Sequence, residues 1–322
     1  MKAVVLYKTC TADELCVSEV PMPTACPGWV LIRVRAFGLN HSEVLLRQFE
    51  ADAPYIHLPR IPGIECVGEV EDPSDTSFRR GQRVIALMGG MGRSFDGSYA
   101  EYTLVPARNV FAVGSELEWV ELAAIPETFY TAYGSLLSLR LSPEDTLLVR
   151  GATSTVGLAA VQMAHGIGAN VFASSRSAAK GDLLRRVGAD EVVVDNGTLE
   201  DEVRKRLPQG INKVLELVGP STLRKSLRLT ARGGIVCHTG ILGGEFSLTG
   251  FDPIKEIPNG VYLTGFYSNY PTQAEIDAMF ALIAKAGIHP VISKVFRLEE
   301  IAEAHRLAER GGSNGKLVVK VG

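Results

Sequence analysis

The chain has 322 residues, 46% of them hydrophobic and 21% charged, with a formal net charge of −3 and five cysteines. This composition suits a globular protein of about two domains, and the lack of a long basic run argues against a nucleic-acid partner. Five scattered cysteines without Cys-x-x-Cys spacing indicate neither a disulfide framework nor a zinc ribbon and fit a reducing compartment. No window approaches the roughly 18 apolar residues of a membrane helix. We therefore expect a soluble, cytoplasmic protein with no membrane partner.

The chain through about Leu122 has the pattern of short strands. β-branched or alternating runs are separated by Pro, Gly, Asp and Ser turns, which predicts an irregular, mostly antiparallel β domain. These runs are "KAVVLYK", "WVLIRVRAFGL", "IECVGEV", "RVIALM" and "SYAEYTLVP".

From Glu121 the pattern becomes helical and then alternates between strand and helix. Six strands are predicted: "TLLVRG", "ANVFASS", "DEVVVD", "KVLELVG", "GGIVCHTG" and "GVYLTGFYS". Such alternation implies an α/β fold with a doubly wound parallel sheet. A helix, strand, helix and strand follow, so we expect this domain (125–267) to be inserted into the first one (1–124 and 268–322).

A glycine-bearing turn, "GATSTVG", lies between the first of these strands and a helix. The free N–H groups at a helix start can hold a pyrophosphate, with Gly151 allowing the tight turn and Gly157 close packing of the helix. Ser154 replaces the usual middle glycine, so its side chain must point away from the phosphates or bond to them. A plain strand-turn-helix without a ligand is the alternative. The turn comprises Gly151, Ala152, Thr153, Ser154, Thr155, Val156 and Gly157.

The end of the second strand predicts the cofactor. It reads Ser174-Ser175-Arg176, with Lys180 following and no acid before Asp182. NAD enzymes keep an acid here for the ribose 2′-hydroxyl, whereas a 2′-phosphate requires a cation. Arg176 offers a planar fork and Lys180 a point charge, so NADPH is preferred over NADH. The alternative is that both are solvated surface cations.

With these residues in view, the whole chain resembles the medium-chain dehydrogenase/reductase superfamily, most closely its zinc-independent quinone oxidoreductase and enone reductase branch. The resemblance implies a GroES-like β domain with an inserted Rossmann domain, and a homodimer paired through the edge strand "GVYLTGFYS". It rests on these blocks in order: "AFGLNHSE", "PRIPGIECVGEV", "RRGQRVIAL", "GSYAEYTLVP", "AAIPETFYTAYGSL", "LRRVGADEVV" and "GKLVVKV".

The resemblance also bears on metal. The catalytic zinc ligands of zinc-dependent relatives fall at Asn40, Ile64 and Glu127 of this chain. Ile64 cannot coordinate, Asn40 is a poor ligand, and one carboxylate cannot hold zinc alone. The structural zinc lobe of those relatives is also missing, since the corresponding segment "IALMGGMGRSFDGSYAEY", across the third and fourth blocks, contains no cysteine. We therefore expect no metal.

Residues beside these positions leave an alternative open. Cys66 and His41 could form a rearranged metal site, although Cys66 is better interpreted as a small buried residue and His41 as a packing or surface histidine. Glu65 keeps its family position and is interpreted as a buried acid that needs a partner.

The resemblance suggests where the nicotinamide lies. Asn40 and Thr131 flank it, the turn from Gly240 to Gly243 closes over it, and Phe266 and Tyr267 lie near the same site. The residues expected to contact the cofactor are Asn40, Thr131, Gly151 to Gly157, Ser174, Ser175, Arg176, Lys180, Val218, Gly240, Ile241, Leu242 and Phe266.

Two departures from the relatives weaken parts of this assignment. Leu45 stands where quinone oxidoreductases carry a tyrosine, so Tyr55, Tyr130 and Tyr267 become candidates for its role, unless water supplies the proton. Asp195 stands where many relatives have an aromatic residue near the adenine, which puts adenine stacking in doubt.

The predicted function is NADPH-dependent reduction of a quinone or an α,β-unsaturated carbonyl, a small-molecule substrate, without a metal. The predicted catalytic residues are Asn40, Thr131, Tyr55 and Tyr267. The alternatives are an alcohol dehydrogenase with an atypical metal site and an NADPH-binding structural or RNA-binding protein of the crystallin type.

Overall fold

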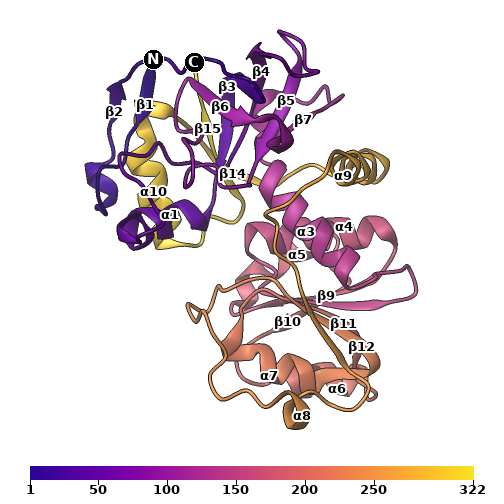
Figure 1. Ribbon diagram of the computed structural model, residues 1–322. Coiled ribbons are helices and arrows are strands. Elements are labelled where there is room, and N and C mark those ends of the chain that lie inside the picture. Colours follow the sequence, from indigo (N-terminus) through magenta and orange to yellow (C-terminus); the bar gives the residue numbers. More distant parts are fainter. The chain divides into compact units, whose positions relative to one another are not determined.

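The computed structural model describes residues 1–322 and divides the chain into two compact units (Figure 1). Unit 1 comprises Met1–Glu127, Asn269–Ala278 and Pro290–Gly322, and unit 2 comprises Thr128–Ser268 and Met279–His289. Two of the boundaries, after Glu127 and after Ser268, lie close to the ends of the segment 125–267. Helix α9 (Gln273–Lys285) is shared, since its second half groups with unit 2. No helix combines the length and the apolar character needed to cross a membrane.

Unit 1 contains a seven-stranded sheet in the order β14-β15-β3-β4-β5-β7, with β6 also paired to β3. All pairs are antiparallel except β14 with β15, so the mostly antiparallel prediction describes it well. A separate two-stranded sheet joins β1 to β2. The strands are β1 (Lys2–Val4), β2 (Val17–Glu19), β3 (Trp29–Leu39), β4 (Glu65–Asp72), β5 (Arg83–Leu87), β6 (Tyr102–Pro106), β7 (Val110–Ala112), β14 (Ile292–Arg297) and β15 (Lys316–Lys320).

Three helices accompany this sheet: α1 (His41–Gln48), α2 (Trp119–Leu122) and α10 (Ile301–Arg310). The sequence pattern predicts only strands in the region of α1. The helix forms because the Glu43 carboxylate accepts the Asn40 backbone N–H at 3.0 Å, as in a capping box. Helix α10 buries Ile301 and Ala304 in the same apolar core as β3.

Unit 2 contains a six-stranded sheet in which every pair is parallel, in the order β10-β9-β8-β11-β12-β13. Helices α4 and α5 lie on one face and α6 and α7 on the other, as the doubly wound prediction requires (Figure 1). The strands are β8 (Thr146–Arg150), β9 (Asn170–Ser175), β10 (Glu191–Val194), β11 (Ile211–Glu216), β12 (Thr230–His238) and β13 (Tyr262–Gly265). The helices are α3 (Pro126–Ser138), α4 (Thr155–Ile167), α5 (Gly181–Arg186), α6 (Leu199–Arg206), α7 (Pro220–Leu229) and α8 (Pro253–Glu256).

The strand order of unit 2 indicates which edge of the parallel sheet would bind a ligand. The chain runs outward from β8 to β10 and then crosses to β11 on the other side of β8. Ligands of open parallel sheets bind outside the carboxyl ends of the strands at such a switch point. The carboxyl ends of β8 and β11, at Arg150 and Glu216, therefore mark the part of unit 2 in which a dinucleotide is expected.

Candidate functional site

The glycine-bearing turn joins β8 to α4. Gly151 has a φ of +84°, and a Cβ at Gly157 would lie 2.6 Å from the Ala152 Cα, so both positions require glycine. The Ser154 hydroxyl accepts the Gly157 N–H at 3.1 Å and donates to the Gly151 carbonyl at 2.9 Å. Ser154 thus caps the helix, while the first N–H groups of α4 have no intrahelical acceptor and favour an anion.

The end of β9 lies against this turn. The Ser174 hydroxyl accepts the Gly151 N–H at 3.3 Å, and its carbonyl accepts the Ala152 N–H at 3.1 Å. Arg176 is exposed and Lys180 is half-buried, and the side chain of neither has a hydrogen-bond or ion-pair partner. Their charges are therefore available to an anionic ligand.

The loop that contains Gly240, Ile241 and Leu242 follows β12 and lies over the turn after β11. One of its N–H groups donates to the Val218 carbonyl at 2.8 Å. The Leu242 side chain reaches the glycine turn, since a Cβ at Gly151 would lie 3.0 Å from its Cδ1. The structure thus brings these predicted cofactor residues together at the carboxyl edge of the sheet.

Thr131 lies on α3 and is buried. The Ser135 hydroxyl donates to the Thr131 carbonyl at 2.7 Å and lies 2.9 Å from the Thr239 hydroxyl, which follows β12. These hydroxyl contacts fix α3 against the carboxyl end of β12. They hold the Thr131 backbone in one position.

The aromatic candidates differ in their surroundings. The Phe266 ring packs against two residues of α3: it lies over Gly134 and meets the Tyr130 ring edge-on at a centroid distance of 5.7 Å. Tyr267 is 72% exposed. Tyr55, in unit 1, is 63% exposed, and its hydroxyl donates to Glu50 at 3.2 Å.

Unit 1 holds a buried charged cluster around Asn40. The Lys316 ammonium lies 2.8 Å from Glu65 Oε1 and donates to Asn40 Oδ1 at 2.5 Å. Asn40 Nδ2 donates to Glu65 Oε1 at 2.9 Å, and the other Glu65 oxygen accepts the Glu127 N–H at 2.7 Å. The acid that the sequence left without a partner is therefore fully engaged. The Asn40 amide is fixed with its oxygen toward the cation.

A second acid completes the cluster. Glu43 is fully buried and accepts the N–H groups of Asn40 and Ile64 at 3.0 and 3.1 Å. Burial, and then the nearby charge of Glu65, raise the pKa of Glu43 to about 7.

The absence of a side chain at Gly38, on β3, leaves room for the buried pair of Glu65 and Lys316. A Cβ at Gly38 would lie 2.5 Å from Glu65 Oε1 and would collide with Lys316 Cε. A residue with a side chain at this position would therefore displace the lysine or the acid.

These residues do not fit a zinc site. Of the three positions that hold zinc in relatives, Asn40 faces an ammonium, Ile64 offers no donor atom, and Glu127 meets Glu65 through its backbone. Nowhere in the chain do three His, Cys, Asp or Glu side chains group so that they could hold a metal ion. Cys66 is part of the apolar core, where burial raises its pKa and disfavours the thiolate that metals bind.

The sequence analysis did not identify Glu43, Lys316 or Arg150 as site residues. Glu43 had a signal, because Asn40-x-x-Glu43 has the spacing of a capping box. Lys316 and Arg150 each stand at one end of an otherwise apolar strand, "KLVV" and "TLLVR". A charged residue at such a place indicates a buried partner but does not say which one.

Comparisons with known proteins agree with this architecture. A family model described as "Alcohol dehydrogenase GroES-like domain" matches residues 26–115, and one described as "Zinc-binding dehydrogenase" matches residues 187–319. The chain is 29% identical to the quinone oxidoreductase of Homo sapiens, over 94% of this chain and 92% of that protein. It is also 29% identical to an alcohol dehydrogenase of Geobacillus stearothermophilus, over 100% of this chain and 99% of that protein.

Solved structures extend the comparison to the whole fold. The crystal structure of AibC is 31% identical, with a TM-score of 0.91 over 100% of this chain and 96% of that chain. The predicted α/β fold, a GroES-like domain with an inserted Rossmann-type sheet, is confirmed. The chain is therefore an oxidoreductase of the medium-chain dehydrogenase/reductase superfamily, in its quinone oxidoreductase branch.

Proposed function

We propose that the protein transfers hydride from NADPH to a quinone or an α,β-unsaturated carbonyl without a metal. The observation that carries this proposal is the hydrogen bond from Lys316 to Asn40, which gives a ligand position of zinc-dependent relatives to a cation of the protein itself. Without a Lewis acid, oxidation of an alcohol loses its main stabilisation, whereas quinones and enones accept hydride readily.

NADPH is the proposed cofactor because Arg176 and Lys180 have no protein partner and no acid stands between them. The turn from Gly151 to Gly157 would hold the pyrophosphate through its N–H groups, and Arg176 would take the 2′-phosphate. When bound, NADPH supplies the hydride. Thr131 and Asn40 remain the proposed neighbours of the nicotinamide.

The proton that completes reduction needs no dedicated donor, because an enolate or hydroquinone anion can take it from water. Tyr55 and Tyr267 are both largely exposed, and they remain the candidate side-chain donors. Replacing each tyrosine by phenylalanine would distinguish a side-chain donor from water, because kcat should fall only when the substituted tyrosine is the proton donor.

The test is NADPH and NADH oxidation by the purified protein against quinones, enals and enones, with a chelator present. We expect turnover of at least one acceptor class, faster with NADPH, and unchanged by the chelator. Alcohol oxidation that needs added zinc would support the alcohol dehydrogenase alternative. Absence of turnover on every acceptor would favour a binding protein.

A further inference from the structure

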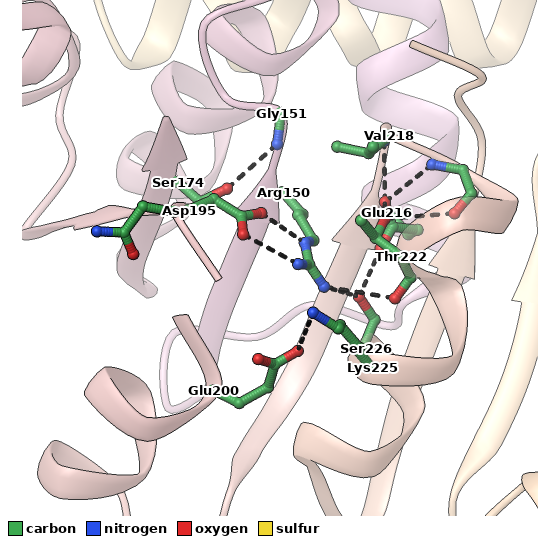
Figure 2. A network of polar contacts seen from close by, with 12 residues as sticks. Arg150, Gly151, Ser174, Asp195, Glu200, Glu216, Val218, Thr222, Lys225 and Ser226 are labelled. Atoms are coloured by element: carbon green, nitrogen blue, oxygen red, sulfur yellow. Dashed lines mark hydrogen bonds and ion pairs between the residues drawn. The ribbon is translucent and has the colours of Figure 1, made fainter. Parts of the chain in front are cut away.

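A buried ion pair lies at the carboxyl edge of the sheet in unit 2. The Arg150 side chain is 1% exposed, and its Nε and one terminal nitrogen donate to the two Asp195 oxygens at 2.9 and 3.1 Å. Figure 2 shows the two groups face to face. This bidentate geometry holds the Asp195 carboxylate in one orientation.

The remainder of the network is satisfied inside the protein. The other Arg150 terminal nitrogen donates to the Ser226 hydroxyl at 3.3 Å, and Ser226 in turn donates to Glu216 (Figure 2). Glu216 also accepts the Val218 N–H at 2.9 Å and the Thr222 hydroxyl at 2.9 Å, and its side chain is fully buried. Asp195, in contrast, reaches solvent, with 17% of its side chain exposed.

Asp195 lies beside the proposed 2′-phosphate site. It follows β10, and its N–H donates to the Ser175 carbonyl at 2.8 Å, one residue before Arg176. An unpaired acid at this place would repel a phosphate. Because Arg150 neutralises Asp195, the acid and an anionic cofactor can be neighbours.

Each Asp195 oxygen accepts one hydrogen bond from Arg150 and keeps a second lone pair. The adenine of a dinucleotide carries an exocyclic amine, which is a donor, whereas hypoxanthine has a carbonyl acceptor at the same place. A carboxylate fixed at the adenosine end of the site therefore favours adenine.

We propose that Asp195 accepts a hydrogen bond from the exocyclic amine of adenine, and that Arg150 is the positioning residue that orients it. Asp195 then supplies by hydrogen bonding the base recognition that an aromatic residue would supply by stacking. The inference rests on the proposed NADPH-dependent function and assigns its base specificity.

The test compares binding of NADPH with that of reduced nicotinamide hypoxanthine dinucleotide phosphate, each followed by fluorescence titration of the full-length protein. A hydrogen bond to a charged group predicts that wild type binds NADPH at least about tenfold more tightly. In the double variant Arg150→Met/Asp195→Leu, which removes both charges together, the affinity ratio should fall to about one. Glu191→Gln, at the amino end of the same strand, should keep the wild-type ratio.

The outcomes distinguish the role of Asp195 in adenine recognition from the proposed NADPH-dependent function. Equal binding of both dinucleotides by wild type, or a ratio that survives in the double variant, overturns the role of Asp195 and leaves the proposed function standing. Binding of neither dinucleotide overturns both. If the double variant does not fold, Asp195→Asn decides, because it replaces the charged acceptor by one neutral oxygen and an amide donor, which should lower the preference for adenine. An unchanged ratio in that variant contradicts the inference.

Discussion

The Lys316 ammonium lies 2.8 Å from the Glu65 carboxylate, and both side chains are buried in unit 1. Removing one partner of a buried pair leaves an uncompensated charge, which costs about 3–5 kcal/mol. We therefore expect Lys316→Met to lower the free energy of unfolding by about this amount in urea denaturation. Lys320→Met, on the same strand but exposed, should change it little. Similar decreases in the free energy of unfolding in both variants would show that the pair of Lys316 and Glu65 adds no stability of its own.

Gly38 should tolerate no side chain. Because a Cβ there would meet Glu65 and Lys316, Gly38→Ala should destabilise the protein by about 1–3 kcal/mol through overpacking. Gly114→Ala is the matched control, since no atom lies within 4 Å of its Cβ position. Thermal unfolding of the two variants gives the comparison. A neutral Gly38→Ala would mean that the cluster moves apart easily.

The pKa of Glu43 predicts a pH dependence. It is about 7 in the folded protein against an ordinary value of 4.5, so between these values the folded state binds more protons than the unfolded one. The contribution of protonated Glu43 to the free energy of unfolding is fully present below pH 4.5 and is lost as the pH rises through 7. The free energy of unfolding should fall by on the order of 3 kcal/mol over this range. Urea unfolding from pH 5 to 8 should show a steeper decline in wild type than in Glu43→Gln. Parallel curves would exclude Glu43 as the titrating group.

Arg176 should select NADPH. Loss of its charge-assisted bond to a 2′-phosphate predicts that Arg176→Ala raises KM for NADPH about tenfold and leaves KM for NADH unchanged. Arg185→Ala provides a control from the same segment, because Arg185 pairs with Asp182 at 3.2 Å. An equal rise in KM for both cofactors in Arg176→Ala would assign it a role other than phosphate recognition.

The edge strand β13 should mediate the proposed homodimer. It pairs only with β12, and Tyr262 on it is 63% exposed, so its outer edge can accept a second strand. A lysine blunts such an edge, and Tyr262→Lys should convert the dimer to a monomer in light scattering after gel filtration. Tyr7→Lys, which changes another exposed tyrosine, should remain dimeric. A monomeric wild type would refute the proposal at once.

The parallel sheet was predictable because its strands are nearly continuous apolar runs separated by helical segments of the usual length. All six predicted strands are present, and the strand order follows the doubly wound arrangement. Helix α1 was missed because its apolar residues are few, and a capping contact between Asn40 and Glu43 defines its start. Capping depends on one local bond, which periodicity does not detect.

The candidate site was predictable only in part. The turn from Gly151 to Gly157 and the cations near it have a local sequence signal, since backbone conformation and charge suffice to recognise them. The partner of Glu65 had no such signal, because Lys316 is distant in the sequence and reaches Glu65 only after β15 pairs with β3. Likewise, the sequence indicates only that Asp195 replaces an aromatic residue of relatives, and its pairing with Arg150 becomes visible only in the folded structure.

The space that Gly38 leaves also has an evolutionary consequence. Gly38, Glu65 and Lys316 share one small volume and one charge balance, so a change at any of them makes the other two unsuitable. Lineages that gain a side chain at position 38 should also have exchanged the lysine and the acid. These three positions, far apart in the sequence, should therefore covary across the superfamily.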